Sequence, residues 1–366
     1  MADAGLRPHA HAALTAAHVP LAAVTRGDGI DSVHRGSIAV VDGNGHLLFA
    51  VGDPHVPTMT RSTLKPFQAL PFVAAGGVER FGYSAAQVAL LCASHSGEPR
   101  HVEAVAGMLA QAGNTEGDLQ CGAHAPGHYE AHGQLPPPPP YSPLAHNCSG
   151  KHSGMLAYCV LCGLPKQDYL AFDHPLQQAI REAVAHYFEM TQADLVAGVD
   201  GCSAPNYAVP LSRLAFGFAK LAAGHDDDRY GRAPRVLADA MMRHPEMVAG
   251  EARSDLALMR LGRGDWLSKI GAEGVQGIGI RSAGIGIAIK IADGGKRALR
   301  PVIATVIEQL GLAEEQDAGN LAEWRAPAIR NYRGSVTGAI RSTFVLDKIA
   351  HPAGGSDTRP NNHATS

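Results

Sequence analysis

Two stretches of the chain alternate between apolar residues and small or polar ones, which is the pattern of β-strands. Residues 37–53 read SIAVVDGNGHLLFAVGD. Glycine and asparagine readily adopt the positive φ angles of a tight turn, so this run predicts two strands joined at Asp-Gly-Asn-Gly. Residues 275–292 contain VQGIGI and IGIAIKIA around a short turn and predict a second β-rich unit. A further strand is expected within residues 338–346, and Lys269-Ile270-Gly271 immediately precedes the strand expected at residue 275.

Between these β-rich segments, apolar residues recur at three- and four-residue intervals. That spacing places them on one face of a helix. It predicts helices over residues 62–75, 84–93, 99–112, 151–162, 175–188, 207–222, 235–242 and 299–312.

The expected organisation is a single domain over residues 19–348, with a helical block inserted between strands from distant parts of the chain. This arrangement predicts an α+β fold in which a mixed sheet is flanked by helices, an α/β/α sandwich. The polyproline run Pro136 to Pro140 is expected to form a stiff loop within the domain. Residues 1–18 and 349–366 lack clear periodicity and are expected to be mobile tails.

Composition narrows the classes of function. The 366 residues are 45% hydrophobic and 18% charged, as in a globular protein, and 31 basic against 34 acidic side chains give a net charge of −3. That balance offers no basic surface for nucleic acid or an anionic membrane. No apolar run is long enough to span a membrane and the N-terminus lacks the apolar core of a signal peptide, so a cytoplasmic protein with reduced cysteines is expected.

The sequence contains only 8 lysines, and two of them stand in suggestive places. Ser62-Thr63-Leu64-Lys65 is a Ser-x-x-Lys at the start of an expected helix, where residues three apart share a face. A lysine that is desolvated beside another cation can lose its proton and deprotonate a serine. Taken alone, the triplet equally fits a helix cap followed by a surface lysine. Ser94 and then Lys269 follow in the order of the three motifs of serine β-lactamases and penicillin-binding proteins, although the neighbouring residues differ.

A second group of residues points to a metal. The segments NCSGKHSG, from residue 147, and DGCSAP, from residue 200, are small-residue turns that can present side chains to one pocket. Cys148 and Cys202, with a lysine, a histidine and an aspartate close in sequence, could form a zinc site, or they could be small buried apolar residues. Cys159-x-x-Cys162 lies in an apolar helix and is interpreted as core packing, and most of the 19 histidines as solvated residues.

Read together, SHSGEPRH, HNCSGKHSGML, DGCSAPNYAVPL and KIGAEGVQ resemble the rhizobial-type, or class 3, L-asparaginases of the asparaginase II family. The resemblance extends from about Val19 to Leu346. It implies a fold related to serine β-lactamases and hydrolysis of L-asparagine to L-aspartate and ammonia. It also implies a homodimer. The departures from the family lie in the loop at residues 122–143, whose histidine and proline content is particular to this chain.

The resemblance further implies two facing Ser-Lys tandems and one zinc ion per chain. The positions carried over are listed here: the tandems are Ser62 with Lys65 and Ser94 with Lys269, the zinc ligands are Cys148, Lys151 and Cys202, and the residues that bind substrate or support the site are Asp200, His95, Arg61 and His152.

The expected mechanism is acyl transfer. Ser62, activated by Lys65, attacks the amide carbon, and the Ser94–Lys269 pair passes a proton to the departing ammonia and helps water release the acyl-enzyme. Two alternatives stay open: a serine-dependent hydrolase of the same layout that acts on glutamine or a β-lactam, and a non-enzymatic zinc-binding or sensing protein. Zinc could be catalytic, substrate-positioning or structural.

Overall fold

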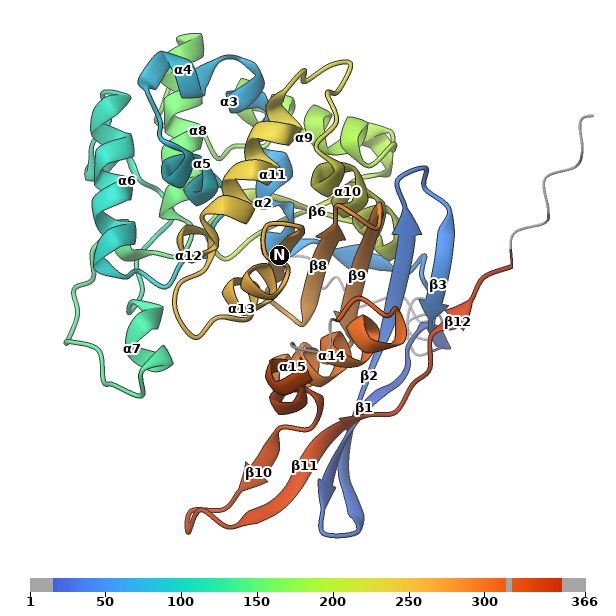
Figure 1. Ribbon diagram of the computed structural model, residues 1–366. Helices are drawn as coiled ribbons and strands as arrows, with labels where there is room; N and C mark the ends of the chain where they lie inside the picture. The colour runs from blue at the N-terminus through green and yellow to red at the C-terminus, as the bar shows by residue number, and fades with distance from the viewer. Residues whose placement is uncertain (1–15, 314–317, 351–366) are drawn as a thin grey trace, which may run out of the picture.

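The computed structural model describes residues 16–313 and 318–350 (Figure 1). Most of both expected tails lies outside the described residues. At their inner edges, Ala17 and His18 are buried, and the Ile349 amide donates a hydrogen bond to the Leu48 carbonyl. The strands are β1 (Val19–Arg26), β2 (Gly29–Asp42), β3 (Leu47–Val51), β4 (Pro57–Met59), β5 (Val196–Val199), β6 (Pro205–Pro210), β7 (Trp266–Gly271), β8 (Val275–Ile280), β9 (Ile285–Ile291), β10 (Ala328–Arg330), β11 (Val336–Ser342) and β12 (Asp347–Lys348).

The helices fill the segments between the strands. The α-helices are α2 (Lys65–Gln68), α3 (Leu70–Ala74), α4 (Gly77–Phe81), α5 (Ala85–Leu91), α6 (Pro99–Gln111), α7 (Gly127–Ala131), α8 (Ser149–Cys162), α9 (Pro175–Tyr187), α10 (Leu211–Ala223), α11 (Ala233–Arg243), α12 (Pro245–Val248), α13 (Ser254–Leu261), α14 (Leu299–Gln309) and α15 (Ala318–Arg325). The 3-10 helices are η1 (Arg61–Leu64), η2 (Glu116–Asp118), η3 (Pro143–Ala145), η4 (Gln192–Asp194) and η5 (Lys296–Ala298).

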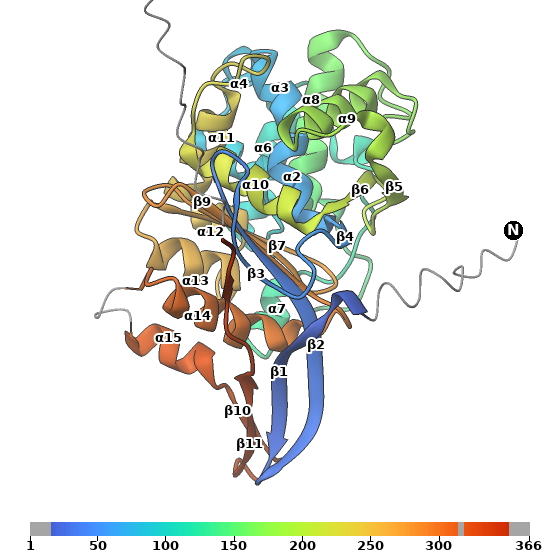
Figure 2. The same ribbon diagram turned by 90° about the vertical axis from the view of Figure 1, so that its right-hand side faces the viewer.

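A large antiparallel sheet organises the molecule. Its order is β10-β11-β1-β2-β9-β8-β7, and β3 pairs with both β2 and β12. The two halves meet where β2 pairs with β9, from Gly36 opposite Ile291 to Asp42 opposite Ile285. Strands from both ends of the chain therefore form one sheet, and the helical block is inserted between them, as Figures 1 and 2 show. The expected α+β class, a sheet flanked by helices, is confirmed, although the strand pairs are all antiparallel and the sheet is not mixed.

The two faces of the sheet bury different side chains because alternate residues point to opposite sides. Isoleucines of β8 and β9, such as Ile278, Ile287 and Ile289, pack in the apolar core that includes α14. Ala39 and Ala288 point to the opposite core, which includes α10 and most of the helical block. Figure 2 shows α13, α14 and α15 on one side of the sheet. Large residues on one face and small ones on the other thus fix which helix covers each side.

A second, smaller sheet of order β4-β6-β5 lies beside the start of η1. The Thr60 amide donates to the Tyr207 carbonyl of β6, which ties the two together. The turn between β5 and β6 carries Asp200 and Cys202. This sheet therefore brings the segment around residue 200 to the beginning of the Ser-x-x-Lys segment.

The expected hairpin at residues 37–53 and the strands at 275–292 are confirmed, and so are most of the expected helices, within a few residues. The helix expected over 62–75 is instead broken into η1, α2 and α3, because Pro66 and Pro71 each lack a backbone donor. The helix expected over 207–222 is also wrong at its start: Tyr207 belongs to β6, and Pro210 precedes α10. Lys269-Ile270-Gly271 does precede the strand that begins at Val275, but Lys269 also lies within a strand that was not expected, β7.

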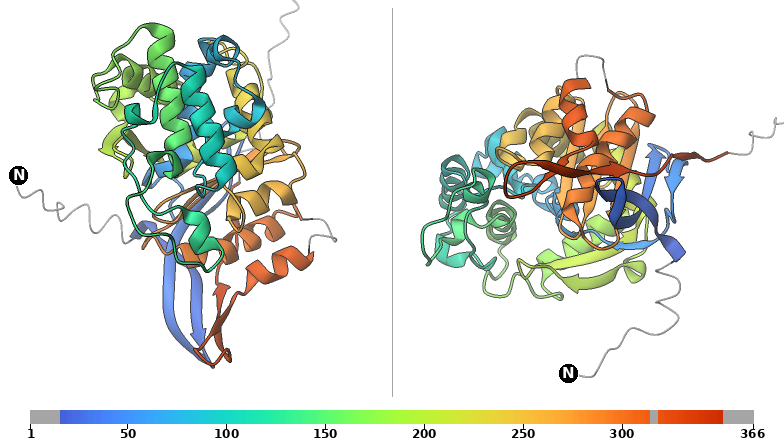
Figure 3. Two further views of the ribbon diagram at one scale, coloured as in Figure 1. Left: turned by 90° about the vertical axis from the view of Figure 1, so that its left-hand side faces the viewer. Right: turned by 90° about the horizontal axis from the view of Figure 1, so that it is seen from below.

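Within the described ranges, no helix has the length and apolar character needed to cross a bilayer. The left view of Figure 3 shows α7 and its flanking loops, which carry the polyproline run, at the edge of the helical block.

The close approach of α10 to the sheet depends on Gly286. A Cβ at this position would lie 1.9 Å from the Ala215 carbonyl oxygen and 2.6 Å from the Ala219 nitrogen, both in the backbone of α10. Gly286→Ala is therefore expected to lower the free energy of unfolding by about 1–3 kcal/mol, because helix and sheet must separate. Gly117→Ala, whose Cβ would meet only the Thr115 hydroxyl at 3.7 Å, is the control. Equal midpoints of urea unfolding for the two variants would contradict this packing.

Candidate active site

The Ser-x-x-Lys segment runs through η1 into α2. Ser62 is partly exposed, whereas Lys65 is 1% exposed and its side chain points into the helical block. The Lys65 amine donates to the Ala93 carbonyl at 2.5 Å, to Ser94 Oγ at 3.0 Å and to the Asn147 carbonyl at 3.3 Å. Among the described residues the partners of this amine come from the loops that follow α5 and η3, and Ser62 is not one of them.

Ser94 lies between the two lysines that the sequence singled out. Its Oγ is 3.0 Å from Lys65 Nζ and 2.8 Å from Lys269 Nζ, and the side chain is almost completely buried. Its backbone is fixed on both sides, because the Ser94 amide donates to the Val248 carbonyl and Arg253 donates to the Ser94 carbonyl. The structure therefore links the expected tandems into one continuous arrangement, Lys65–Ser94–Lys269.

Lys269 stands on β7, the edge strand of the large sheet, and its side chain is fully buried. Burial lowers the pKa of this lysine to about 7, and the positive charges of Lys65 and Arg253 act in the same direction. Asp255 opposes the shift from 3.7 Å away. At neutral pH a substantial fraction of the Lys269 amine is consequently uncharged and able to accept a proton.

His95 is buried one residue after Ser94 and supports the loop. Its Nδ1 accepts a hydrogen bond from the Gly97 amide, and its Nε2 lies 2.8 Å from Ser149 Oγ. Burial, together with the nearby His101 and Lys65, holds the pKa of His95 well below the usual range, so the ring is neutral and Nε2 carries the proton. The ring fastens the Ser94 loop to the start of α8.

Arg61 and Asp200 form an ion pair beside Ser62, with Nε 2.8 Å from the carboxylate oxygen. Arg61 has a φ of 49°, in the left-handed region that non-glycine residues seldom adopt. The side chain of Asn206 stabilises that backbone by accepting from the Arg61 amide and donating to its carbonyl. Burial disfavours the charged form of Asp200, but Lys151 and Arg61 outweigh it and lower the pKa of this carboxyl.

The three expected metal ligands, Cys148, Lys151 and Cys202, come together near the Arg61–Asp200 ion pair. Cys148 and Cys202 are buried, and the Lys151 amine lies 2.9 Å from Cys202 Sγ. A hydrogen bond from Cys202 and the charges of Lys65 and Lys151 lower the pKa of Cys148 well below its usual value despite burial. Burial also opposes the charged form of Lys151, yet the two cysteines raise its pKa. The group is thus an anionic Cys148 thiol that is hydrogen-bonded to Cys202 and balanced by the charge of Lys151.

These residues fit a zinc ion in donor chemistry, since two thiolates and an amine are ligands that zinc accepts once the amine loses its proton. His152, on α8 beside Lys151, adds a buried Nε2 that has no hydrogen-bond partner among the described residues, while its Nδ1 contacts the Tyr169 hydroxyl at 2.7 Å. No cluster of three or more histidine, cysteine, aspartate or glutamate side chains in residues 16–313 and 318–350 is placed to hold a metal. A metal here would therefore depend on Lys151.

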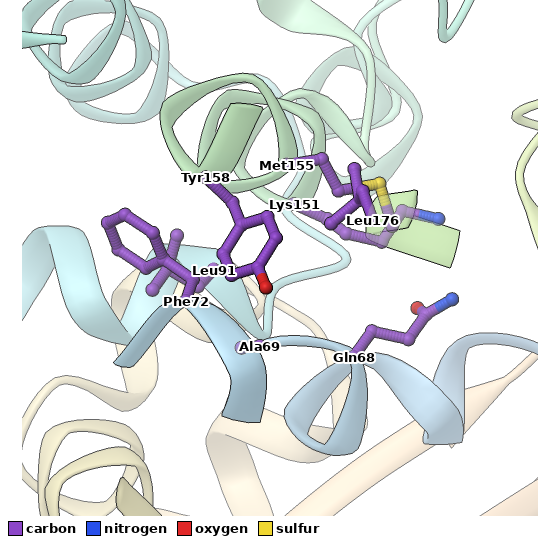
Figure 4. Close-up of a pocket in the computed structure, with 9 residues that line it drawn as sticks. Gln68, Ala69, Phe72, Leu91, Lys151, Met155, Tyr158 and Leu176 are labelled. Atoms are coloured by element: carbon purple, nitrogen blue, oxygen red, sulfur yellow. The ribbon is translucent and has the colours of Figure 1, made fainter. Parts of the chain in front are cut away.

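Figure 4 shows a cavity that is lined in part by Lys151 and lies between α2, α3, α5, α8 and α9. Its lining residues are Gln68, Ala69, Phe72, Leu91, Lys151, Gly154, Met155, Tyr158 and Leu176. The walls are mostly apolar and include neither serine of the tandems. The cavity consequently lies outside the reacting part of the site.

Sequence reasoning missed several residues that hold the site together. Asp255, Arg253 and Asn206 all contact residues that the motifs identified, but from elements 14 or more positions away in sequence. The Ser-Asp pair at residues 254–255 does mark a helix start, and Asn206 directly follows the DGCSAP turn. Neither signal indicates which distant side chain it meets. The C-x-x-C interpretation as packing agrees with Cys159 being buried, whereas Cys162 is exposed at the end of α8.

Comparison with known proteins identifies the class. A family model described as L-asparaginase II matches residues 22–342, which cover most of the chain. The match places the protein among the hydrolases that act on amides. More narrowly, the chain belongs to the L-asparaginase II family, as the motifs had indicated.

Two solved structures are similar to the chain. A β-lactamase candidate from Bacteroides dorei shares 13% identity with a TM-score of 0.39, covering 75% of this chain and 93% of its own. A β-lactamase from Mycobacterium bovis shares 16% identity with a TM-score of 0.36, covering 79% of this chain and 95% of its own. No curated protein matches the chain. The homodimer expected from the family resemblance stays a prediction.

Proposed function

We propose that the protein is an L-asparaginase, which hydrolyses the side-chain amide of L-asparagine to L-aspartate and ammonia. Family membership supports an amide substrate. The observation that carries the proposal is the position of Ser94 Oγ between the buried amines of Lys65 and Lys269. Buried amines in contact through a hydroxyl form a path along which a proton can move, which acyl transfer from an amide requires.

Ser62 is the proposed nucleophile. It is partly exposed and can meet a substrate, whereas Ser94 is enclosed by the two lysines. Ser62 also precedes Lys65 by three residues, one turn of η1, so the proposal requires a change of rotamer in one of the two side chains to bring oxygen and amine together. Ser94 then serves as the relay and Ser62 as the group that forms the acyl-enzyme.

The proton balance follows from the linked amines. As Ser62 attacks the amide carbon, its proton passes to Lys65, which gives one to Ser94, which gives its own to the neutral Lys269. Collapse of the tetrahedral intermediate returns a proton along the same path to the leaving nitrogen, and ammonia departs. Water then attacks the ester, its proton is taken up by the relay, and the aspartate product leaves as Ser62 regains its proton.

Arg61 and Asp200 are the proposed recognition pair. The guanidinium of Arg61 is one quarter exposed and can donate hydrogen bonds to the α-carboxylate of an amino acid. The carboxylate of Asp200 can accept hydrogen bonds from its α-ammonium group. In the absence of substrate the two side chains neutralise each other at 2.8 Å. Binding a zwitterion would exchange this internal pair for two ion pairs with the substrate, without leaving a buried charge unpaired.

Cys148, Lys151 and Cys202 are the proposed zinc ligands, with His152 beside them. Zinc bound there would supply a Lewis acid that positions polar groups of the substrate. The residues themselves hold two thiols and one amine close to Asp200, since Lys151 lowers the pKa of this carboxyl. Cys148 and Lys151 lie at the start of α8, and Cys202 lies in the same turn as Asp200, so these three residues join α8 to the recognition pair. This structural role does not depend on whether zinc acts on the reacting bond.

The first prediction concerns substrate and nucleophile together. The purified protein is expected to release ammonia from L-asparagine faster than from L-glutamine, because the recognition pair fixes the distance to the amide. Ser62→Ala is expected to lower kcat by about a thousandfold or more at an unchanged melting temperature. The exposed Ser335→Ala variant is the matched control. Preference for glutamine, or a fully active Ser62→Ala variant, would contradict the proposal.

The second prediction concerns pH. The relay needs an uncharged Lys269, whose pKa is about 7, so kcat/KM is expected to rise with pH through that value. Lys269→Arg keeps a permanent charge and is expected to abolish activity. Lys220→Arg, at the cation–π contact with Tyr187, is the control for the substitution itself. A profile that is flat between about pH 6 and pH 8 would exclude Lys269 as the terminal proton acceptor.

The third prediction concerns the metal. Cys202→Ser is expected to lower the zinc content per chain and the melting temperature, whereas the exposed Cys162→Ser should change neither. Chelation of the wild-type protein is expected to raise KM or lower stability more than it lowers kcat. Zinc binding should also weaken as pH falls, because Lys151 must lose its proton to bind. Equal zinc contents, measured by elemental analysis, in both cysteine variants would rule out this site.

A further inference from the structure

Asp255 is a buried carboxylate at the start of α13, and its relation to Lys269 goes beyond an ordinary helix terminus. The residue is 1% exposed. One oxygen accepts from Ser268 Oγ at 2.7 Å and from Gln276 Nε2 at 3.2 Å, and the other accepts from the Ile270 amide at 2.9 Å. These donors come from β7 and β8 on both sides of Lys269. Its position is thus determined by the sheet as well as by its own helix.

The second of these oxygens is also the one that faces the Lys269 amine, at 3.7 Å. That amine donates to Ser94 Oγ and to the Ile270 carbonyl, so its three neighbours are a hydroxyl, a carbonyl and a carboxylate. Two residues earlier, Arg253 donates to the Ser94 carbonyl. The beginning of α13 therefore contacts both members of the Ser94–Lys269 pair, although these come from different parts of the fold.

We infer that Asp255 is a positioning residue, which holds the Lys269 amine beside Ser94 and stabilises the ammonium that forms when this amine accepts a proton. The inference rests on the proposed acyl-transfer function and adds a residue to it. Without the carboxylate, burial and the neighbouring cations would dominate at the amine, which would stay neutral but be a poor proton acceptor.

The charged and titratable groups that face Lys269 support this assignment. Lys65 on α2 and Arg253 before α13 disfavour its ammonium form, and Asp255 and Cys148 favour it. Cys92 is also near, but burial raises the pKa of this thiol to about 12, so it is uncharged. Asp255 is the acidic group in closest contact. Its loss should therefore change the protonation of Lys269 more than the loss of any other acidic neighbour.

The test is Asp255→Asn, which keeps the size of the side chain and removes its charge. The acidic limb of the kcat/KM profile for asparagine is expected to move to lower pH by about one unit or more, with a lower plateau, because Lys269 becomes a weaker base. Asp265→Asn is the matched control. Asp265 lies just before β7, and its carboxylate accepts hydrogen bonds from the amide and hydroxyl of Ser282 and not from Lys269. An unshifted limb in Asp255→Asn would overturn the inference.

A readout without substrate separates this inference from the proposed function. The native Lys269 has a pKa below its value in the unfolded chain, so the native state binds fewer protons above about pH 7 and stability rises with pH there. In Asp255→Asn that rise begins at lower pH, so its deficit in melting temperature should shrink between about pH 5.5 and pH 8. A constant deficit, as expected for Asp265→Asn, would overturn the inference. If the wild-type protein releases no ammonia but the deficit of Asp255→Asn still shrinks with pH, only the proposed function is refuted.

If Asp255→Asn does not fold, Asp255→Glu provides the test. It keeps the charge and displaces the carboxylate by one methylene. The acidic limb should then stay in place while kcat falls by about tenfold or more, because the amine is no longer held at Ser94. Wild-type kcat in Asp255→Glu would show that position at Lys269 is unimportant and would overturn the inference.

Discussion

The structure depends on the burial of two lysine amines around one serine oxygen. An ammonium group removed from water is costly unless it is paired or gives up its proton, and two such groups a few ångströms apart also repel each other. Lys65 meets this constraint with two backbone carbonyls and Ser94, and Lys269 meets it by titrating near neutrality beside Asp255. The site can thus take up a proton at low energetic cost, because the pKa of Lys269 lies near neutral pH.

The fold serves this constraint by joining distant segments. Lys65 enters from the helical block, where Pro66 and Pro71 divide the chain into short helices and turn it inward. Lys269 enters from the edge strand of the sheet, and α13 connects the two sides. The sheet and the block come close because Gly286 lets α10 rest directly on β9. The helical block is inserted between strands of the sheet and leaves the order of the strands intact. Lys65 and Lys269, which are far apart in sequence, can therefore both contact the Ser94 oxygen.

Much of this could be predicted from the sequence, and the limit has a physical cause. Local periodicity correctly predicted the 37–53 hairpin, and the glycine-isoleucine alternation correctly predicted β8 and β9. Motifs selected Ser62, Lys65, Ser94 and Lys269, which the structure places in one region, although it joins Lys65 to Ser94 where the i,i+3 spacing had suggested Ser62. Side-chain partners such as Asp255 escape such reasoning, because one aspartate at a helix start resembles any other until the tertiary contact is known. The strand containing Lys269 escaped for another reason: WLSKIG is buried on both faces, so it shows no alternation of apolar and polar residues.

The three lysines buried within the described residues show how environment assigns opposite roles to one side chain. Lys151 lies among thiols that favour its charge, and Lys269 lies among cations that disfavour it. Lys65 lies between them: its charge lowers the pKa of Cys148 on one side and that of Lys269 on the other. A change of charge at Lys65 would consequently be felt in both directions. Proton movement through the relay and the charge of the Cys148 thiol are therefore coupled through Lys65, which contacts Ser94 on one side and Cys148 on the other.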